Sequence, residues 1–535
     1  MIQIHTISFS YPDSAVTLFE DFSAVLGTAG GSGTGSWTCI AGANGCGKTT
    51  LLHLIEGTLI PSAGSISSGN AVYCAQNCGT LPENAYASFW DADNDIRRFF
   101  SMTGIKEEQF DRWETLSGGE KKRIQIACVL AEEPQVLLLD EPTNHLDAAS
   151  KEQILRALAL YRGTGVIVSH DRAFSDELCG STLYLFRPAV SFSGGADCVQ
   201  GKTYPGGLGR ALELREAETG AARAEWQKND DAAAKAASLS DKWQREAEHS
   251  ANRMRKSLAV KKGDHDAAAR IDAARISGKD KTAGDTGKRF ATRLAQAAAK
   301  RDSLVHPLSR KEGFSIDVPE GDSYVPEILL SLKAQILSTG NAGTGDSYSL
   351  EIPDLLIRRK SRIALTGENG TGKTMLVRKI TECLSGKPYF CLPQEVSGEE
   401  TVRVIKRFES LDDAQRGQVL STVYRMGSEP DQLLTGHHAD QVKISPGELR
   451  KLMIAMAVCG CNTDNQTSIP MQILILDEPT NHMDILSTQS LEPALNAVAC
   501  ALLVISHDAV FLEHTGCSEI WHITRKEKTG KLELL

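Results

Sequence analysis

The sequence lacks any CxxC pair of cysteines, although thirteen cysteines are spread over its 535 residues. Scattered cysteines are typical of a reducing compartment, so we interpret them as free thiols and exclude a disulfide-stapled secreted scaffold. Long hydrophobic runs are also missing, because the longest, 497–505, is far shorter than the roughly 20 residues of a membrane-spanning helix. The first residues lack the basic stretch and apolar core of a signal peptide. These absences predict a cytoplasmic protein that neither enters nor crosses a bilayer.

The composition is ordinary for a folded protein, with 41% hydrophobic and 24% charged residues, which excludes wholesale disorder. At roughly 150 residues per domain, the length predicts three or four domain-sized pieces. The formal net charge is -10, yet residues 201–310 hold 23 Lys and Arg against 15 Asp and Glu. Basic charge is therefore confined to one segment, and it suits an anionic partner such as a phosphate backbone.

One ordered set of motifs occurs twice. Each set has a glycine-rich loop ending in Gly-Lys-Thr, a glutamine, a short Ser-x-Gly-Glu sequence, an apolar run ending in Asp-Glu-Pro-Thr-Asn-His, and Ser-His-Asp. The loop lysines, Lys48 and Lys373, lie 325 residues apart, and the histidines, His170 and His507, lie 337 apart. Recurrence at a nearly fixed spacing indicates a tandem duplication of one domain.

Each glycine-rich loop stands between an apolar run and a helix-forming run, which is the strand-loop-helix context of a phosphate-binding loop. The predicted strands are 37–40 and 362–365, and the predicted helices are 51–55 and 375–380. The unbroken apolar runs 136–139 and 473–476 predict buried parallel strands that end in carboxylates. The sequence therefore predicts an α/β fold with two tandem P-loop domains.

The stretch between the copies predicts a long helical hairpin. No proline occurs from 206 to 306, and 221–260 is rich in helix-forming residues and contains no glycine. Glycines cluster between 263 and 287, and a second helix-forming run covers 288–304. The expected domains are the first repeat at 1–196, a basic helical linker at 197–312 and the second repeat at 313–535.

The glycine-rich loops predict nucleotide binding. Successive backbone N–H groups and the following helix N-terminus surround phosphate oxygens, and glycine permits this close approach. We expect Lys48 and Lys373 to reach the β- and γ-phosphates of ATP. The expected nucleotide-binding residues are Gly42, Ala43, Asn44, Gly45, Cys46, Gly47, Lys48, Thr49 and Thr50 in the first copy, and Gly367, Glu368, Asn369, Gly370, Thr371, Gly372, Lys373 and Thr374 in the second.

A magnesium site is expected beside each loop. The hydroxyls of Thr49 and Thr374 are placed to bind Mg²⁺, and Asp140 and Asp477 are placed to hold the same ion directly or through water. Oxygen donors of this kind are those that Mg²⁺ prefers.

The residue after each metal-binding carboxylate predicts the catalytic step. Glu141 and Glu478 are placed to orient or deprotonate the attacking water, which requires a carboxylate near the γ-phosphate. His170 and His507 are expected to contact the γ-phosphate and to detect its presence. A structural ion pair at the glutamates and a core role for the histidines are the competing interpretations.

In this order the motifs resemble those of an ATP-binding cassette: Walker A, glutamine loop, LSGGE signature, Walker B and switch histidine. Two such cassettes in one chain, a charged helical linker and the extended TNHLD and TNHMD sequences are similar to the ABC-F proteins, cytosolic ATPases that act on ribosomes. In that family the linker reaches from the tRNA exit region towards the peptidyl transferase centre. The resemblance covers nearly the whole chain.

The resemblance implies further site residues. Gln76 and Gln394 would sense the γ-phosphate and the metal ion, and Tyr11 would stack on adenine unless it is an ordinary core residue. The signature of each cassette would close on the ATP of the other. The completing residues are Ser445 and Gly447 for the site of Lys48, and Ser117, Gly118 and Gly119 for the site of Lys373.

The chain departs from the family pattern at Pro446 and before Lys373, and only 39 residues separate Gln76 from Leu116, which leaves no room for the extra helical arm that some ABC-F members insert there. Pro446 replaces a signature glycine and has no N–H to donate, so we expect the site of Lys48 to be slower. No clear adenine-stacking aromatic residue precedes Lys373, and Tyr348 is a weak candidate. Cys46 lies near a helix N-terminus whose field should favour the thiolate, which would allow redox regulation, although any small residue fits that position.

The leading hypothesis is a twin-cassette ATPase that binds the ribosome. ATP binding and hydrolysis would gate engagement of the linker, residues 221–304, with rRNA or tRNA, in translation or in antibiotic resistance by ribosome protection. Its charge pattern favours shape recognition of structured RNA over base reading. The chain would act as a monomer whose cassettes pair with each other. The alternatives are an ATPase subunit pair for a separate membrane transporter and a nucleotide-gated RNA-binding module.

Overall fold

The computed structural model describes the chain except residues 13–16, 28–35, 77–78, 91–96, 98–99, 102, 145, 188–197, 258–288, 290, 297–298, 300–325, 340–347, 429–443, 461–470, 482 and 527. The chain forms two compact units. The first combines Met1–Pro188, Ala196–Ala211 and Arg310–Leu535, and the second combines Ala189–Gly195 and Leu212–Ser309. The first unit contains both motif sets, which we call the first copy (residues 1–205) and the second copy (326–535).

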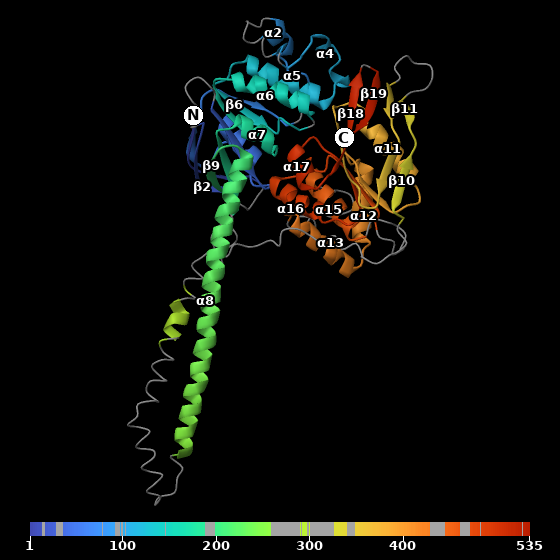
Figure 1. Ribbon diagram of the computed structural model, residues 1–535. Helices are drawn as coiled ribbons and strands as arrows, with labels where there is room; N and C mark the ends of the chain where they lie inside the picture. The colour runs from blue at the N-terminus through green and yellow to red at the C-terminus, as the bar shows by residue number, and fades with distance from the viewer. Residues whose placement is uncertain are drawn as a thin grey trace, which may run out of the picture. The chain divides into compact units, whose positions relative to one another are not determined.

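The first copy is built on a six-stranded sheet with the order β5-β6-β7-β3-β8-β9 (Figure 1). Its strands are β3 (Ser36–Gly42), β5 (Ala71–Cys74), β6 (Val136–Asp140), β7 (Thr164–Val168), β8 (Ser181–Phe186) and β9 (Gln200–Pro205). All neighbours pair in parallel except β9, which is antiparallel to β8. The boundary expected at 196 thus precedes β9, which extends the sheet of the first copy to Pro205.

The second copy repeats this order as β15-β16-β17-β14-β18-β19 and adds β12 and β11 beyond β19. Its strands are β11 (Gln335–Thr339), β12 (Tyr348–Ile352), β14 (Arg362–Gly367), β15 (Tyr389–Leu392), β16 (Ile473–Asp477), β17 (Ala501–Ile505), β18 (Glu519–Lys526) and β19 (Thr529–Leu534). The six-strand order shared by the two sheets confirms the α/β fold with two tandem P-loop domains.

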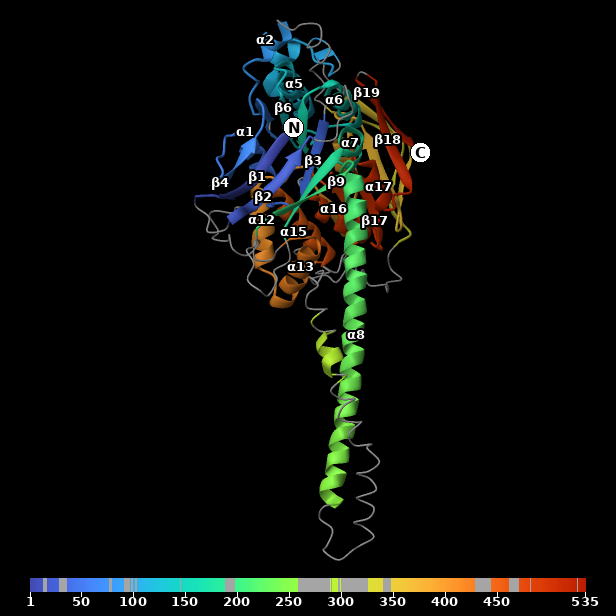
Figure 2. The same ribbon diagram turned by 90° about the vertical axis from the view of Figure 1, so that its left-hand side faces the viewer.

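Each copy also has a smaller antiparallel sheet. In the first copy, β1 (Ile2–Ser10) lies between β2 (Thr17–Leu26) and β4 (Ala63–Ser67), as Figure 2 shows. In the second copy, β10 (Ile328–Leu332) pairs with β13 (Leu355–Arg358). Apolar side chains from the large and small sheets share one core in each copy.

Helices connect the strands and cover the sheets (Figures 1 and 2). The first copy has α1 (Lys48–Glu56), α2 (Ala85–Trp90), α4 (Glu108–Asp111), a short 3₁₀ helix (Trp113–Thr115), α5 (Gly118–Ala131), α6 (Ala148–Leu160) and α7 (Arg172–Leu178). The second has α11 (Lys373–Cys383), α12 (Gly398–Glu409), α13 (Asp413–Arg425), α15 (Pro446–Val458), α16 (Ile485–Asn496) and α17 (Ala509–His514). Aspartates cap α6, α7, α16 and α17 by accepting backbone N–H bonds, which explains where these helices begin.

The linker begins with one continuous helix, α8 (Leu208–Ser257), of 50 residues. It starts before the expected position 221 because α7 supplies its caps: Leu208 N donates to Ser175 Oγ at 3.1 Å, and Gly209 N donates to Asp176 Oδ1 at 2.9 Å. Of the second run, 288–304, the described residues Arg289, 291–296 and Ala299 are helical. The expected hairpin tip at 258–288 lies outside the described residues. No described helix has both the length and the apolar character required to span a membrane.

Candidate nucleotide-binding and catalytic sites

The two glycine-rich loops have the same backbone conformation. Gly47 and Gly372 are the N-caps of α1 and α11, in left-handed conformations with φ of 84° and 93°. Lys48 and Lys373 are therefore the first residues of their helices. The described structure thus confirms the predicted strand-loop-helix arrangement, which turns backbone N–H groups at a helix N-terminus towards one place.

The first glycine of each loop cannot be replaced without strain. A Cβ on Gly42 would lie 2.4 Å from the carbonyl oxygen of Leu185, and a Cβ on Gly367 would lie 2.6 Å from that of Ile523. Both glycines also have φ near 150°, a conformation that other residues rarely adopt. Glycine is required here because each loop packs directly on the neighbouring strand.

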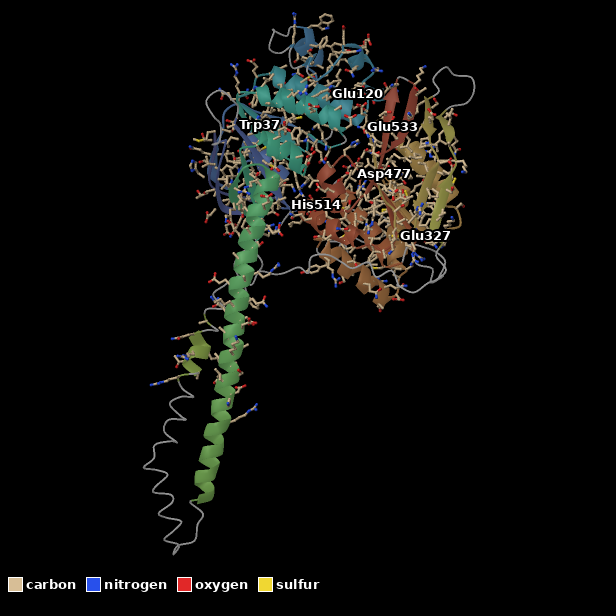
Figure 3. The ribbon with its side chains drawn as sticks, viewed as in Figure 1. Trp37, Glu120, Glu327, Asp477, His514 and Glu533 are labelled. Atoms are coloured by element: carbon tan, nitrogen blue, oxygen red, sulfur yellow. The ribbon has the colours of Figure 1, made fainter. Side chains whose placement is uncertain are left out.

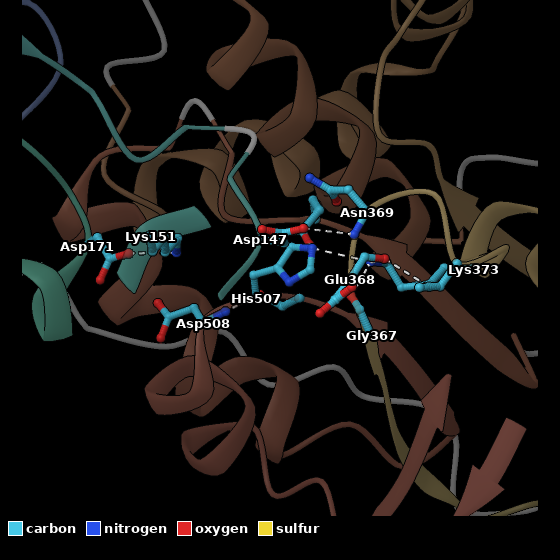
Figure 4. Close-up of polar contacts among 12 residues, drawn as sticks. Asp147, Lys151, Asp171, Gly367, Glu368, Asn369, Lys373, His507 and Asp508 are labelled. Atoms are coloured by element: carbon cyan, nitrogen blue, oxygen red, sulfur yellow. Dashed lines mark hydrogen bonds and ion pairs between the residues drawn. The ribbon is translucent and has the colours of Figure 1, made fainter. Parts of the chain in front are cut away.

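Each loop lysine folds back over its own loop. Lys48 Nζ donates to the carbonyl oxygens of Gly42 and Ala43 at 2.9 and 3.1 Å. Lys373 Nζ donates to the carbonyls at the corresponding positions at 2.6 and 3.0 Å. It also lies 3.3 Å from His507 Nε2, and burial lowers its pKa (Figure 4). Each ammonium is therefore held within the loop that the sequence analysis assigned to the phosphates.

The residues expected to bind Mg²⁺ are adjacent. Thr49 Oγ1 donates to Asp140 Oδ2 at 2.8 Å, and Tyr73 OH donates to the same oxygen at 3.1 Å. In the second copy, Thr374 and Asp477 line one cavity, and burial raises the pKa of Asp477. A hydroxyl and a carboxylate beside a phosphate-binding loop fit the hard, oxygen-preferring Mg²⁺ ion.

The residue after each Walker B strand has a strained backbone. Glu141 and Glu478 have φ of 45° and 47°, and each donates its backbone N–H to the end of the neighbouring strand at 2.9 Å. A non-glycine residue in this region costs about 1–3 kcal/mol and persists where its surroundings hold it. Glu141 Oε1 lies 3.0 Å from His170 Nε2, and Glu478 Oε1 lies 3.7 Å from His507 Nε2. Each copy thus brings its predicted base and its predicted switch histidine together.

Burial shifts the protonation of these pairs. It raises the pKa of Glu141 to about 8 and that of Glu478 to about 7, because an ionised carboxylate loses its hydration. Burial also lowers the pKa of His170 to about 3 and that of His507 to about 4. Both histidines are therefore neutral at physiological pH, and both carboxyl groups change charge near the pH at which a general base is most useful.

A cavity of about 460 Å³ contains the loop of the second copy together with residues of the first. The second copy contributes Gly370, Gly372, Lys373, Thr374, Gln394, Asp477, Glu478 and His507, and the first contributes Glu141, Lys151 and His170. The structure therefore gathers most of the residues predicted for the second site around one space.

Two aspartates that the sequence analysis missed join the copies. Asp484 Oδ2 accepts a hydrogen bond from the backbone N–H of Asn44 at 2.8 Å, and Asp147 Oδ2 accepts one from Asn369 at 3.2 Å (Figure 4). Each aspartate ends the DEPTNHxD sequence of one copy and contacts the glycine-rich loop of the other. Its recurrence at the 337-residue spacing was the available signal.

A buried ion pair between the copies occurs on one side. Arg172 Nη2 lies 3.0 Å from Glu492 Oε1, and both side chains are nearly buried. His514, labelled in Figure 3, places Nδ1 2.9 Å from Glu492 Oε2. The 337-residue spacing puts Ala509 and Leu155 at the corresponding positions, so the other side cannot form this pair.

The signature residues lie apart from the described cavity. Ser117 caps α5 in a capping box with Glu120, and Ser117 and Gly118 are exposed, whereas Gly119 is buried. In the second copy, Ser445 caps α15, Pro446 is its first residue, and Gly447 is buried. Neither set is among the residues described as lining the cavity. Closure of each signature on the opposite loop stays a prediction.

Two buried cations missing from the sequence analysis hold the glutamine loops. Lys122 Nζ donates to the carbonyl oxygens of Ala75 and Gln76 at 2.5 and 3.5 Å. At the matching position on α15, Arg450 donates to the carbonyl oxygens of Gln394 and Glu478. Both cations come from the signature helix, so they tie that helix to the glutamine loop of its own copy.

Tyrosines lie beside both loops. Tyr11 OH lies 2.8 Å from Thr50 Oγ1, its ring packs edge-on against Phe9, and the residue is 45% exposed. Tyr348 OH donates to the carbonyl oxygen of Thr371 at 2.7 Å, and the Arg525 guanidinium lies over its ring at 5.3 Å. Tyr348 is therefore the aromatic residue at the second loop, despite its weak sequence pattern.

Of the two interpretations of Cys46, the structure favours the small buried residue over the thiolate. The side chain is buried, and burial raises the pKa of its thiol, outweighing the opposite effect of the Lys48 charge. The helix N-terminus does not compensate for the loss of water around the sulfur. Cys46 therefore fits the alternative interpretation, that of a small residue filling the loop.

The chain is similar to ABC transporter proteins and to a ribosome protection protein. A family model described as ABC transporter matches residues 32–144. The ribosome protection protein VmlR of Bacillus subtilis (strain 168) is 27% identical over 504 residues, which cover 90% of this chain and 80% of that protein. A putative ABC transporter ATP-binding protein of Nitratidesulfovibrio vulgaris is 31% identical over 211 residues, covering 34% of this chain and 75% of that protein.

Two further comparisons concern family and fold. ABC transporter F family member 2 of Arabidopsis thaliana is 39% identical over 158 residues, covering 27% of this chain and 23% of that protein. The solved structure of the archaeal ribosome recycling factor aABCE1 with the stalk protein aP1 gives a TM-score of 0.57 at 16% identity, covering 98% of this chain and 89% of that one. At this identity the likeness is one of fold.

Proposed function

We propose that this chain, which belongs to the ATP-binding cassette family, is an ABC-F ATPase that binds the ribosome and uses ATP to gate engagement of its basic linker with rRNA or tRNA. The similarity to VmlR carries this proposal, since it extends over 504 residues and hence over both copies. That relative is named a ribosome protection protein, so translation and antibiotic resistance are the processes in which we place this chain. We propose the cytoplasm as its location and a monomer as its working form.

The chain is an ATP hydrolase, and matching residues of the two copies have the same roles in ATP binding and hydrolysis. Lys48 and Lys373 bind the phosphates, in concert with the backbone N–H groups of their loops. Glu141 and Glu478 accept a proton from the attacking water, for which a pKa near neutrality is suited. A bound Mg²⁺ ion, held by the threonine and aspartate of each site, would neutralise charge on the phosphates.

Closure of the copies supplies the switch. The neutral histidines His170 and His507 contact the γ-phosphate through one N–H, so the contact is lost when the phosphate leaves. Ser117, Gly118 and Gly119 complete the second site, and Ser445 and Gly447 complete the first, when the signatures move onto the bound ATP. Gln76 and Gln394, tied to the signature helices by Lys122 and Arg450, connect the metal site to this movement.

The linker makes the contact with RNA. The described helix α8 carries exposed basic side chains, including Arg223, Lys228 and Lys235, interspersed with acids such as Glu225 and Asp231. A mixed and irregular charge pattern suits recognition of phosphate backbones by shape and charge. We assign the linker to residues 197–312, between cassettes at 1–196 and 313–535, with β9 as an addition to the first cassette sheet.

Ribosome co-sedimentation tests the proposal. The Glu141→Gln/Glu478→Gln double variant binds ATP without hydrolysing it, so it should pellet with ribosomes in ATP and stay in the supernatant in ADP or without nucleotide. Near-physiological salt is required, because low salt exaggerates contacts between basic helices and RNA. A variant that binds ATP and never pellets would exclude the ribosome as partner.

A charge-reversal variant of α8, paired with a charge-conserving control, tests whether the linker contributes to ribosome binding. Arg223→Glu/Lys228→Glu/Lys235→Glu should weaken ribosome pelleting and flatten its salt dependence, while leaving ATP binding unchanged. The control Arg223→Lys/Lys228→Arg/Lys235→Arg keeps the charge and should pellet normally. Equal pelleting of all three proteins would assign ribosome binding to another part of the chain.

A further inference from the structure

Lys151 belongs to the first copy but lines the cavity around the loop of the second. It lies on α6, four residues after Asp147, and lines the cavity together with Lys373, Glu478 and His507. Figure 4 shows Lys151 beside Asp171. The α6 helix begins where Asp147 accepts the N–H of Asn369, so the contact between the copies fixes the position of this lysine. A cation from one copy thus faces the proposed nucleotide site of the other.

The ammonium of Lys151 has capacity for another acceptor. Its Nζ donates to Asp171 Oδ2 at 2.6 Å, and this is its one hydrogen-bond partner among the described residues. An ammonium has three donors, so two are available to an anion in the cavity. The side chain is 20% exposed and therefore lies at the cavity wall rather than in bulk solvent.

The position of Lys151 within the cavity indicates which part of a ligand it meets. Lys151 lines the same cavity as Glu478 and His507. The proposed function places these two residues at the γ-phosphate. Lys151 therefore lines the cavity in which the γ-phosphate of the second site would lie.

At the first site, the residue equivalent to Lys151 is not a cation. The 337-residue spacing puts Thr488 at the position of Lys151. Thr488 is buried, and its Oγ1 donates to the carbonyl oxygen of Asp484 at 3.2 Å. The two sites therefore differ by one positive charge supplied from the opposite copy.

We propose that Lys151 is a nucleotide-binding residue of the second site, where its ammonium binds the γ-phosphate of ATP across the interface between the copies. This inference rests on the proposed assignment of Lys373 and Glu478 to that site. A charge-assisted bond to a phosphate oxygen strengthens ATP binding, and ADP lacks the oxygen to accept it. Lys151 makes the second site discriminate between ATP and ADP and ties the first copy to ATP held by the second.

Titration calorimetry of the full chain with Mg²⁺ and ATP or ADP tests this proposal. In a Lys48→Ala/Glu478→Gln background, binding is restricted to the second site and turnover is blocked. Adding Lys151→Thr, which copies Thr488, should weaken ATP binding at least about tenfold, equivalent to about 1.4 kcal/mol, and change ADP binding less than about twofold. Lys151→Arg keeps the charge and should restore most of the ATP affinity.

Two controls separate nucleotide binding from a structural role. Asp171→Asn removes the ion pair but keeps a residue able to cap α7, so it should preserve the ATP-to-ADP affinity ratio that Lys151→Thr loses. In a Lys373→Ala/Glu141→Gln background, which restricts binding to the first site, Lys151→Thr should leave both affinities unchanged.

The outcomes that overturn the proposal are distinct. Equal weakening of ATP and ADP, or the same effect from Asp171→Asn, would give Lys151 a structural role only. Normal ATP affinity in the Lys151→Thr protein would exclude the contact. Failure of the Lys48→Ala/Glu478→Gln protein itself to bind ATP would instead refute the assignment of the second site. The proposed role of Lys151, which rests on that assignment, would then also be refuted.

Discussion

Asp484 Oδ2 of the second copy accepts the backbone N–H of Asn44 in the first, at 2.8 Å and across 440 residues of sequence. Asp484 is buried, and its other oxygen, Oδ1, accepts the N–H of Ser487 at the start of α16. One carboxylate therefore starts a helix in its own copy and positions a phosphate-binding loop in the other. Because Asp147 does the same in the opposite direction, each loop is shaped partly by the opposite copy.

Replacing Asp484 should separate these two functions. Asp484→Asn keeps an oxygen that can cap α16 but loses the charge, so it should retain stability and lower ATP turnover several-fold. Asp484→Ala should additionally lose about 1 kcal/mol of stability from the missing cap. Steady-state ATP hydrolysis and denaturant unfolding measure the two effects. Normal turnover in both variants would show that the contact with Asn44 has no part in hydrolysis.

The ion pair between Arg172 and Glu492 should stabilise the contact between the copies. Arg172→Ala leaves a buried carboxylate without its cation, and we expect a loss of about 3 kcal/mol in unfolding free energy. Arg172→Ala/Glu492→Leu places the residues of the opposite side at both positions and should recover most of that loss. Urea unfolding of the three proteins checks this, and a double variant as unstable as the single one would contradict the expectation.

Stability without nucleotide should fall as pH rises from 6.5 to 8. Burial raises the folded-state pKa of Glu141 to about 8 and of Glu478 to about 7, from an ordinary value of 4.5. In this range the folded protein binds more protons at these sites than the unfolded chain does, so the free energy of unfolding decreases with pH. His170 and His507, with lowered pKa values in the folded state, oppose this slope near pH 6.5, where their unfolded imidazoles are about half protonated, and are neutral in both states towards pH 8.

The Glu141→Gln/Glu478→Gln variant tests the origin of this slope. It removes both titrating groups while keeping their size, and its unfolding free energy should depend less on pH over the same range. Denaturant titrations of both proteins at pH 6.5, 7.2 and 8, free of Mg²⁺ and nucleotide, give the comparison. Parallel pH profiles would assign the slope to other groups.

Pro446 should slow hydrolysis at the first site. It is the first residue of α15 and has no N–H to offer a phosphate, whereas Gly118 at the equivalent position has one. In a Glu478→Gln background, Pro446→Gly should raise ATP turnover at least about threefold. The same substitution in a Glu141→Gln background serves as the control and should have no effect. An unchanged rate in the first background would remove Pro446 as the source of unequal sites.

The sequence was sufficient for features encoded locally. The apolar run before Lys48 and the glycines of its loop predicted β3 and α1, because a phosphate-binding loop combines all its determinants within a few residues. The duplication likewise predicted that β14 and α11 would repeat them. These features depend on residues that are adjacent in the chain, so the sequence pattern is enough to predict them.

Features that depend on distant packing were not predicted. The part of Lys122 and Arg450 in holding the glutamine loops requires knowing that the signature helix packs over them. The early start of α8 depends on a hydrogen bond to Ser175, which lies on another helix. The pKa of the Cys46 thiol depends on burial, which the loop sequence does not reveal. Signature closure, by contrast, is implied by the family resemblance and would require a movement of one copy relative to the other.

The anchoring of α8 on α7 has a mechanical consequence. The α7 helix begins two residues after His170, and its Ser175 and Asp176 hold the first N–H groups of α8. At 1.5 Å per residue, the 50 residues of α8 form a lever arm of about 75 Å. A tilt of about 5° at its base would sweep the far end of a helix of that length through about 6 Å, so a small rotation beside His170 becomes a movement of several ångströms at the end of one uninterrupted helix.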